Sequence, residues 1–197
     1  MEKPFSQASE NNKQPILQVV EPYLMRVKDV LEIGSGTGQH AVYLAAALSH
    51  LQWQTSDLGA NHEGINMWLA EAGLKNVLAP LELDAAAELW PKLKAGAVFT
   101  ANTVHYMPWA HACELFKKVA TVLQSSAPFL LYGPFNYDGR FISDGNERLD
   151  AWLKNIDPQF GIRDFEVVVE RVEKAGFVLD EEHIMPANNR LLAFLRA

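Results

Sequence analysis

The sequence predicts an α/β fold, in which helices cover both faces of a seven-stranded, mostly parallel sheet that ends in an antiparallel hairpin. Short apolar runs alternate with segments of helical periodicity up to residue 132, and this alternation is typical of parallel strands joined by right-handed crossovers. The last two strand-like runs are separated only by residues 186–189. That connection is too short for a crossover, so the two runs are expected to pair antiparallel. The length of 197 residues favours a single domain over residues 1–197.

The first two-thirds of the chain supply five strands. Residues 1–26 form an arm and a helix: residues 1–10 are polar and predict a loose arm, and helical spacing runs from Asn11 to Pro22, which ends or kinks the helix. Pro80 places the third strand near the sheet edge, and Gly73 stops the helix before it. Strands are predicted at 27–33, 51–56, 76–83, 97–101 and 128–132, and helices at 39–49, 61–72, 85–93 and 109–123.

The last third has a different character. Residues 135–146 are rich in Gly, Asn, Asp and aromatic residues, which predicts a long loop. Helical patterns follow at 146–155 and 164–175, and strand-like runs at 177–184 and 190–195 form the hairpin. Loops of this length in a compact domain are usually functional or disordered. We therefore expect residues 135–176 to hold a substrate loop and its helices.

Composition excludes several classes of protein. A single cysteine, Cys113, rules out an intrachain disulfide framework and a multi-cysteine zinc site, and the spacing of the six histidines predicts no metal site. The net charge of 17 − 24 = −7 argues against nucleic acid and anionic membranes as partners. The sequence predicts neither a membrane helix nor a secretory signal. We expect a cytoplasmic protein with a small-molecule partner; the sequence gives no indication of oligomeric state.

A glycine-rich turn is the strongest functional signal. Gly34, Ser35, Gly36 and Gly38 lie between a predicted strand and a predicted helix, where glycines let a ligand approach the backbone and amides face it. The pattern is not a P-loop, because no Gly-Lys-Ser/Thr follows. A dinucleotide fingerprint fits only when counted from Gly36, beyond the strand end. The glycines alone therefore leave NAD and S-adenosylmethionine open.

Polar residues at the ends of four successive strands distinguish these two ligands. Glu32 precedes the glycines, where a dinucleotide has no obvious use for an acid, whereas a cationic ligand does. Asp57, Asp84 and Asn102 follow the next three strands. In an open α/β sheet these ends share one crevice, which is the usual ligand position.

This arrangement resembles the class I S-adenosylmethionine-dependent methyltransferases over residues 27–134, and the resemblance implies a Rossmann-like fold and S-adenosylmethionine as cofactor. It also implies roles for individual residues. The glycine turn contacts the methionine part with Glu32 behind it, Asp57 binds the ribose, and Asn102 meets the amino group. Asp84, with Leu83 and Ala85, meets the adenine.

A narrower resemblance rests on blocks spread over nearly the whole chain. Residues 10–17, 102–109, 132–135, 161–164 and 185–189 are similar to domain-of-unknown-function family 938, which includes the methyltransferase-like 26 proteins. An arginine usual in this family is replaced here by Asn11. The family implies a fold and a cofactor, but no substrate.

The methyl acceptor is expected beyond the fourth and fifth strands. His105 follows the fourth strand and is a candidate general base, with a hydrogen-bonded structural histidine as the alternative. Tyr137, Arg140 and Arg163 are candidate substrate-binding residues. These residues predict a methyltransferase acting on a small polar or anionic molecule. The alternatives are a cofactor-binding module without catalysis and an NAD-dependent oxidoreductase, which lacks a recognisable Tyr-x-x-x-Lys.

Overall fold

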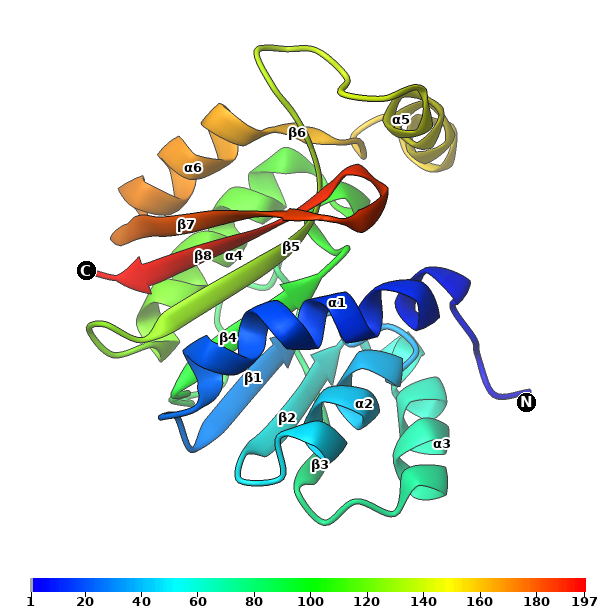
Figure 1. Cartoon of the computed structure of the whole chain (residues 1–197), viewed down its shortest axis with the longest axis vertical. Helices are drawn as coiled ribbons and strands as arrows, with labels where there is room; N and C mark the ends of the chain where they lie inside the picture. Colours follow the sequence, from blue (N-terminus) through cyan, green and yellow to red (C-terminus); the bar gives the residue numbers. More distant parts are fainter. Residues whose placement is uncertain (1) are drawn as a thin grey trace.

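A twisted sheet forms the centre of the protein, and helices cover both of its faces (Figure 1). The computed structural model describes residues 2–197. Seven strands follow the order β3-β2-β1-β4-β5-β8-β7, and the two-residue β6 pairs with β5 outside this path. The α/β fold class with a terminal hairpin is therefore confirmed. The strands are β1 Asp29–Ile33, β2 Gln52–Asp57, β3 Val77–Glu82, β4 Ala97–Ala101, β5 Pro128–Asn136, β6 Arg163–Asp164, β7 Phe177–Met185 and β8 Asn189–Arg196.

Strand direction decides where a ligand can bind. The pairs among β1 to β5 are all parallel, whereas β8 runs antiparallel to both β5 and β7. Because parallel strands end at one edge, the loops after β1, β2, β3 and β4 gather there. β3 is the edge strand of this half of the sheet, as Pro80 predicts.

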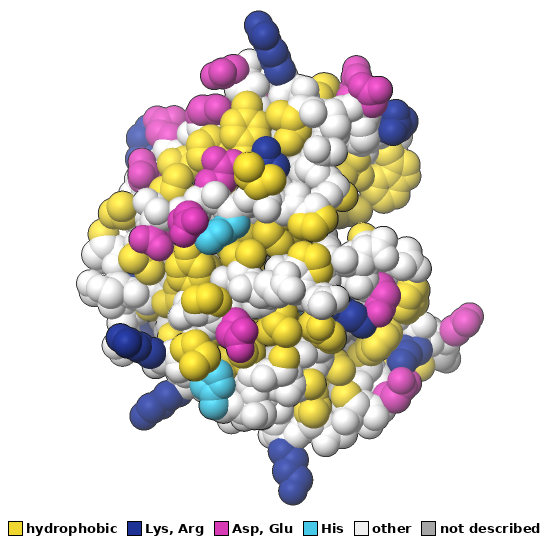
Figure 2. All heavy atoms as spheres, in the orientation of Figure 1, with side chains coloured by type: hydrophobic (Ala, Val, Ile, Leu, Met, Phe, Trp, Pro, Cys, Tyr) yellow, Lys and Arg dark blue, Asp and Glu magenta, His cyan; other side chains and the backbone are white. Residues whose placement is uncertain are grey.

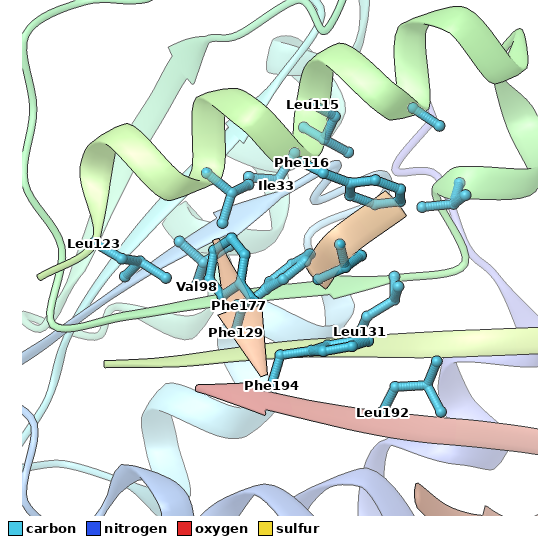
Figure 3. Packing of buried hydrophobic residues seen from close by; sticks show 14 of the residues in the cluster. Ile33, Val98, Leu115, Phe116, Leu123, Phe129, Leu131, Phe177, Leu192 and Phe194 are labelled. Atoms are coloured by element: carbon cyan, nitrogen blue, oxygen red, sulfur yellow. The ribbon is translucent and has the colours of Figure 1, made fainter. Parts of the chain in front are cut away.

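Two separate apolar cores hold the layers together. On one face, helices α1 (Gln7–Leu24) and α2 (Gln39–Ala47) bury side chains such as Ile16 and Leu44 against the strands. On the other face, α4 (Trp109–Val122) and α6 (Phe165–Lys174) cover a core centred on Phe129, which contacts Phe194 in β8 (Figure 3). The remaining helices are α3 (His62–Ala72), α5 (Asp144–Ile156) and the short η1 (Gly59–Asn61), η2 (Val104–Tyr106) and η3 (Pro186–Asn188).

The predicted arm is not loose, which corrects the interpretation of residues 1–10; Met1 lies outside the described residues. Helix α1 begins at Gln7, because the Ser6 hydroxyl accepts a hydrogen bond from Ser9 N and caps it. Before the helix, Pro4 O accepts from the Trp68 indole at 2.7 Å. The helix also runs past Pro22 to Leu24. The chain start is therefore docked on α3.

The predicted helix at 85–93 is absent, and turns replace it. Asp84 Oδ1 accepts from Ala86 N, which begins a helix-like turn. The Lys118 ammonium, from α4, then bonds to the carbonyls of Ala85 and Ala87, and Pro91 follows. The Lys118 contacts hold these carbonyls in the turn, and Pro91 has no amide hydrogen with which to continue a helix.

Strand β5 continues to Asn136, four residues beyond its predicted end at Tyr132. Pairing explains the extension: Pro134 lies opposite Asn189 of β8, and Phe135 and Asn136 pair with β6. The predicted loop at 135–146 is correspondingly shorter, since α5 begins at Asp144. Pairing partners this distant in sequence leave no local pattern, so strand β6 was also missed.

Candidate functional site

The glycine turn between β1 and α2 has the positive φ angles that its sequence predicts: 71° at Gly34, 58° at Gly36 and 90° at Gly38. Two of these glycines are needed for packing. A Cβ at Gly34 would lie 2.6 Å from Thr103 Oγ1, and one at Gly38 would lie 3.3 Å from the Ile65 Cα atom. At Gly36 a Cβ would meet nothing within 4 Å. The Gly36 backbone therefore faces open space that a ligand can enter.

Asp57, at the carboxyl end of β2, fixes this turn. Its Oδ2 atom accepts from Gly36 N at 2.6 Å, and its Oδ1 atom accepts from Leu58 N and Asn61 Nδ2, each at 2.7 Å. An ionised carboxylate has about four lone-pair positions, so one remains for a further donor. Asp57 thus joins the ends of β1 and β2 and still has capacity to bind a ligand.

Glu32 lies behind the turn. It is 1% exposed, and its Oε2 atom accepts hydrogen bonds from Ser35 Oγ at 2.9 Å and from the Trp53 indole at 3.0 Å. Burial raises the pKa of Glu32 to about 7, and the negative charge of Asp57 adds to this rise. The Ser35 hydroxyl also accepts from Ser56 N. Glu32 therefore connects the glycine turn to β2 through these two hydrogen bonds.

The end of β3 lies next to Asp57. Leu83 N donates to Asp57 O at 3.1 Å, and the Leu83 side chain is buried, whereas Asp84 is exposed. The Asp84 carboxylate accepts from Ala86 N, and its carbonyl accepts from the Trp90 indole. The sequence-predicted neighbours Leu83, Asp84 and Ala85 therefore lie beside Asp57 at the sheet edge.

Asn102 and His105 both lie beside β5. Asn102 has a φ of 56°, and its backbone N–H donates to Tyr132 O at 2.9 Å. A Cβ at Gly133 would lie 3.7 Å from His105 Nδ1 and 4.0 Å from Asn102 Oδ1. Both distances are ordinary van der Waals contacts, so the β5 backbone at Gly133 lies directly beside the two side chains.

His105 is almost fully buried, and burial lowers the pKa of its imidazole to about 3, with the Arg163 charge adding to the effect. The ring is therefore neutral at pH 7. Together with Gly133, Phe135 and Arg163 it lines a cavity of about 10 Å³, room for about one water molecule. The structure thus brings His105 and Arg163 to one cavity.

Arg163 is held by backbone carbonyls. Its Nη2 atom donates to Met107 O and Gln159 O, each at 2.7 Å, and its guanidinium lies over the Trp109 ring. Its Nε atom is buried and has no hydrogen-bond partner within residues 2–197. The guanidinium is thereby fixed through Nη2, while its buried Nε donor has no protein partner among the described residues.

The other two predicted substrate residues lie elsewhere. Residues 137–140 form a tight turn closed by reciprocal backbone hydrogen bonds between Tyr137 and Arg140. The Tyr137 ring stacks on Phe165, and its hydroxyl donates to Glu182 of β7. Arg140 is exposed, and neither residue lines the His105 cavity. Their role in substrate binding remains a prediction.

Three contributors to the site were missed from sequence: Thr103, Trp53 and Gly133. Thr103 packs on Gly34, Trp53 bonds to Glu32, and Gly133 lines the His105 cavity. A tryptophan or glycine inside an apolar strand has the pattern of an ordinary core residue. Thr103 lies in the polar segment after the fourth strand, and this position could have identified it as a site residue.

The surface is hollowed between α5 and the start of α1, on the side toward which the arrowheads of β1, β2 and β4 point (Figures 1 and 2). Hydrophobic side chains gather on the α5 wall of this crevice (Figure 2). Within residues 2–197, no three His, Cys, Asp or Glu side chains form a metal-binding group, and no helix combines the length and apolarity needed to span a membrane.

Several solved structures with a similar architecture are described as methyltransferases. An O-methyltransferase family protein from Burkholderia thailandensis is similar with a TM-score of 0.85 at 17% identity, over 96% of this chain and 57% of that one. The mitomycin 7-O-methyltransferase MmcR gives 0.82 at 18% identity, over 95% and 54%. Human N-acetylserotonin methyltransferase, in complex with S-adenosylmethionine, gives 0.80 at 12% identity, over 97% and 53%. This chain spans little more than half the length of these proteins.

Fold and strand-end geometry together place the chain among proteins with the class I methyltransferase-like fold. Identities this low establish the fold alone. The chain belongs to the family described as protein of unknown function (DUF938), whose model matches residues 3–196. This confirms the family resemblance of the sequence blocks.

Proposed function

We propose that this protein is an S-adenosylmethionine-dependent methyltransferase that acts on a small polar or anionic molecule. One observation carries the proposal: the open backbone face at Gly36 lies directly beside the carboxylate of Asp57, at an edge that Asp84 and Asn102 also reach. The fold family and a structural relative in complex with S-adenosylmethionine support it.

The residues present fit this cofactor. A ligand with ribose hydroxyls needs a carboxylate with a free lone pair, and Asp57 has one after its three hydrogen bonds. A cationic ligand is favoured by a site with acidic residues and no opposing cation among its predicted members. Gly34, Ser35, Gly36 and Gly38 would hold the methionine part, Asp57 the ribose, and Leu83, Asp84 and Ala85 the adenine. Asn102 would meet the amino group, and S-adenosylmethionine would supply a methyl group activated on sulfur.

The acceptor side is provided by His105 and Arg163. A histidine with a pKa of about 3 is neutral and a weak base at pH 7, so it binds and orients an acceptor oxygen or nitrogen better than it removes a proton. Methyl transfer by in-line displacement depends strongly on such positioning. Arg163 supplies the positive charge for an anionic acceptor.

A screen for S-adenosylhomocysteine release tests this function. Purified protein is incubated with S-adenosylmethionine and fractionated small-molecule extracts, and product is measured with and without the protein. We expect release with at least one fraction, and a loss of about 10²-fold in turnover for His105→Gln with cofactor affinity preserved. Firm cofactor binding without turnover in any fraction would favour a non-catalytic cofactor-binding module.

Two finer assignments belong to the same proposal. Within the DUF938 family, the sequence blocks favour the methyltransferase-like 26 proteins as relatives. The composition favours a cytoplasmic location. The substrates named for the structural relatives remain theirs, because this chain spans only part of their length.

A further inference from the structure

The cavity beside His105 is too small to hold a whole methyl acceptor. Its volume of about 10 Å³ is room for one water molecule. An acceptor that reaches His105 with a polar atom must therefore keep the rest of its body outside this cavity. The side chains exposed next to His105 decide which kind of body binds there.

Three aromatic rings meet at this position. Tyr106 follows His105 in η2, the short helix after Asn102, and is 42% exposed. Its ring contacts Trp152 of α5 with centroids 6.2 Å apart at 81°, and Phe160 with centroids 6.4 Å apart at 70°. Both are edge contacts, so the rings touch without stacking face to face. Because Trp152 is also 51% exposed, ring surface on Tyr106 and Trp152 stays open.

The backbone that carries two of these rings is fixed. Arg163 Nη2 donates to Met107 O, directly after Tyr106, and to Gln159 O, directly before Phe160, each at 2.7 Å. One guanidinium thus connects the two segments. Side chains on a backbone held in this way lose little further freedom when a ligand binds, which favours affinity.

Helix α5 exposes apolar side chains beside these rings. Trp152 and Ile156 lie four residues apart, on one face of the helix, and are 51% and 54% exposed. The buried residues of α5 include Asn146 and Asp150 instead. A helix that only covers a core buries its apolar stripe. The gathering of hydrophobic side chains on the α5 wall of the crevice (Figure 2) is therefore typical of a binding surface.

We propose that the methyl acceptor carries a planar aromatic ring, and that this ring packs against Tyr106 and Trp152 in the crevice. The inference rests on the proposed methyltransferase function and names the class of its substrate. Aromatic pairs gain free energy beyond the area that they bury, so open ring surfaces favour a flat ring over a saturated one. The polar or anionic group of the acceptor is then a substituent of this ring, directed toward His105.

The first test compares flat and saturated probes. Protein saturated with S-adenosylhomocysteine is titrated with 4-hydroxybenzoate, 6-hydroxy-2-naphthoate and trans-4-hydroxycyclohexanecarboxylate, and binding is measured by calorimetry and tryptophan fluorescence. At least one aromatic acid should bind about tenfold more tightly than the saturated acid. Equal affinities, or no binding of either aromatic acid, would overturn the aromatic acceptor.

The second test locates the ring. Trp152→Ala should weaken the bound aromatic acid about tenfold, and Trp152→Phe should restore part of the affinity. The melting temperature should stay close to that of the wild type, because the side chain is half exposed. Ile184→Ala is the control, since Ile184 is an exposed apolar residue of β7. Unchanged affinity in Trp152→Ala would remove Trp152 from the acceptor site.

A second copy of this chain is the other occupant that an apolar stripe could have. Sedimentation velocity of the wild type and Trp152→Ala distinguishes the two. A wild-type dimer that becomes monomeric in Trp152→Ala would overturn the acceptor proposal, whereas an unchanged mass leaves the stripe open and supports it.

The two proposals fail in different ways. Binding of S-adenosylhomocysteine without any preference for aromatic acids overturns the acceptor class while the cofactor proposal stands. If S-adenosylhomocysteine fails to bind the wild type, the methyltransferase proposal itself is overturned. Retained binding of S-adenosylhomocysteine in Trp152→Ala, with loss of the aromatic acid, supports both.

Discussion

Asp57 does two things in this fold. Through Gly36 N, Leu58 N and Asn61 Nδ2 it holds the glycine turn and the start of the next segment in place, and it keeps a lone pair for a ligand. A residue with both structural and binding roles links stability to affinity. Substitution of Asp57 should therefore lower the stability of the ligand-free protein.

We expect Asp57→Ala to lower both the stability of the fold and the affinity for S-adenosylmethionine. The variant leaves Gly36 N without its partner, which costs about 1–3 kcal/mol of stability, and affinity for S-adenosylmethionine should fall by a similar amount. Thermal unfolding and titration calorimetry measure the two effects. Asp29→Ala is a useful comparison, because its carboxylate accepts from Gly96 N at the opposite end of β1. Equal affinity in Asp57→Ala and the wild type would remove Asp57 from the binding site.

Buried titratable groups set the pH dependence of stability. Burial lowers the pKa of His40 to about 4 and that of His105 to about 3, so between these values and 6.5 the unfolded chain binds more protons and stability falls as pH falls. Glu32 opposes this trend: its pKa is raised to about 7, so between 4.5 and 7 the folded chain holds the proton and stability falls as pH rises. The two histidines outweigh the one glutamate. The free energy of unfolding is therefore expected to decrease by about 1.4 kcal/mol for each pH unit of acidification between pH 6.5 and 4.5.

The Glu32→Gln variant tests this balance. Without the opposing carboxyl group, the loss of stability between pH 6.5 and 4.5 should become steeper by about 1.4 kcal/mol per pH unit. Denaturant unfolding at pH 5, 6 and 7 measures the slope. An unchanged slope would show that Glu32 titrates alike in the folded and unfolded chains.

Local patterns predicted most helices and strands, and they failed where distant residues decide the structure. Gly73 ends α3 with a φ of 60°, as its sequence position indicates. Residues 85–93 have good helical composition, but Lys118, in a helix far along the chain, takes two of their carbonyls. The end of β5 likewise depends on pairing with β6 and β8. The sequence does not reveal such partners.

Lys118→Met tests whether that contact shapes the segment after β3. The variant keeps the length of the side chain and removes its donors, so hydrogen exchange over residues 84–93 should speed up while α4 stays protected. Lys117→Met is the control, since Lys117 pairs with Glu114 on the surface. Identical exchange in both variants would mean that Lys118 does not hold this segment.

The molecule as a whole is one sheet with a core on each face. The glycine turn and the polar strand ends were predictable because each follows a strong local pattern. The acceptor side was predicted in part: His105 and Arg163 line one cavity, whereas Tyr137 turns toward β7, a partner that its local sequence does not indicate. Asn136 Oδ1 and Asn146 Nδ2, which are buried without a hydrogen-bond partner in the described part of the chain, have no distinctive sequence context.

A shared sheet predicts that residues 1–197 unfold as a single domain. Phe129 contacts Phe116, Phe177 and Phe194, which come from α4, β7 and β8. Phe129→Ala should therefore cost about 3–5 kcal/mol and shift the circular dichroism and tryptophan fluorescence transitions together. Separate shifts of the two signals would indicate two folding units.

The most direct test of the account is titration calorimetry of the purified protein with S-adenosylmethionine and, separately, with NAD. The open Gly36 backbone and the acids at neighbouring strand ends predict stoichiometric binding of S-adenosylmethionine and its weakening in Asp57→Ala. Binding of NAD is expected to be far weaker, because the dinucleotide fingerprint is displaced from the strand end. Tighter binding of NAD than of S-adenosylmethionine, or no binding of S-adenosylmethionine, would contradict the account.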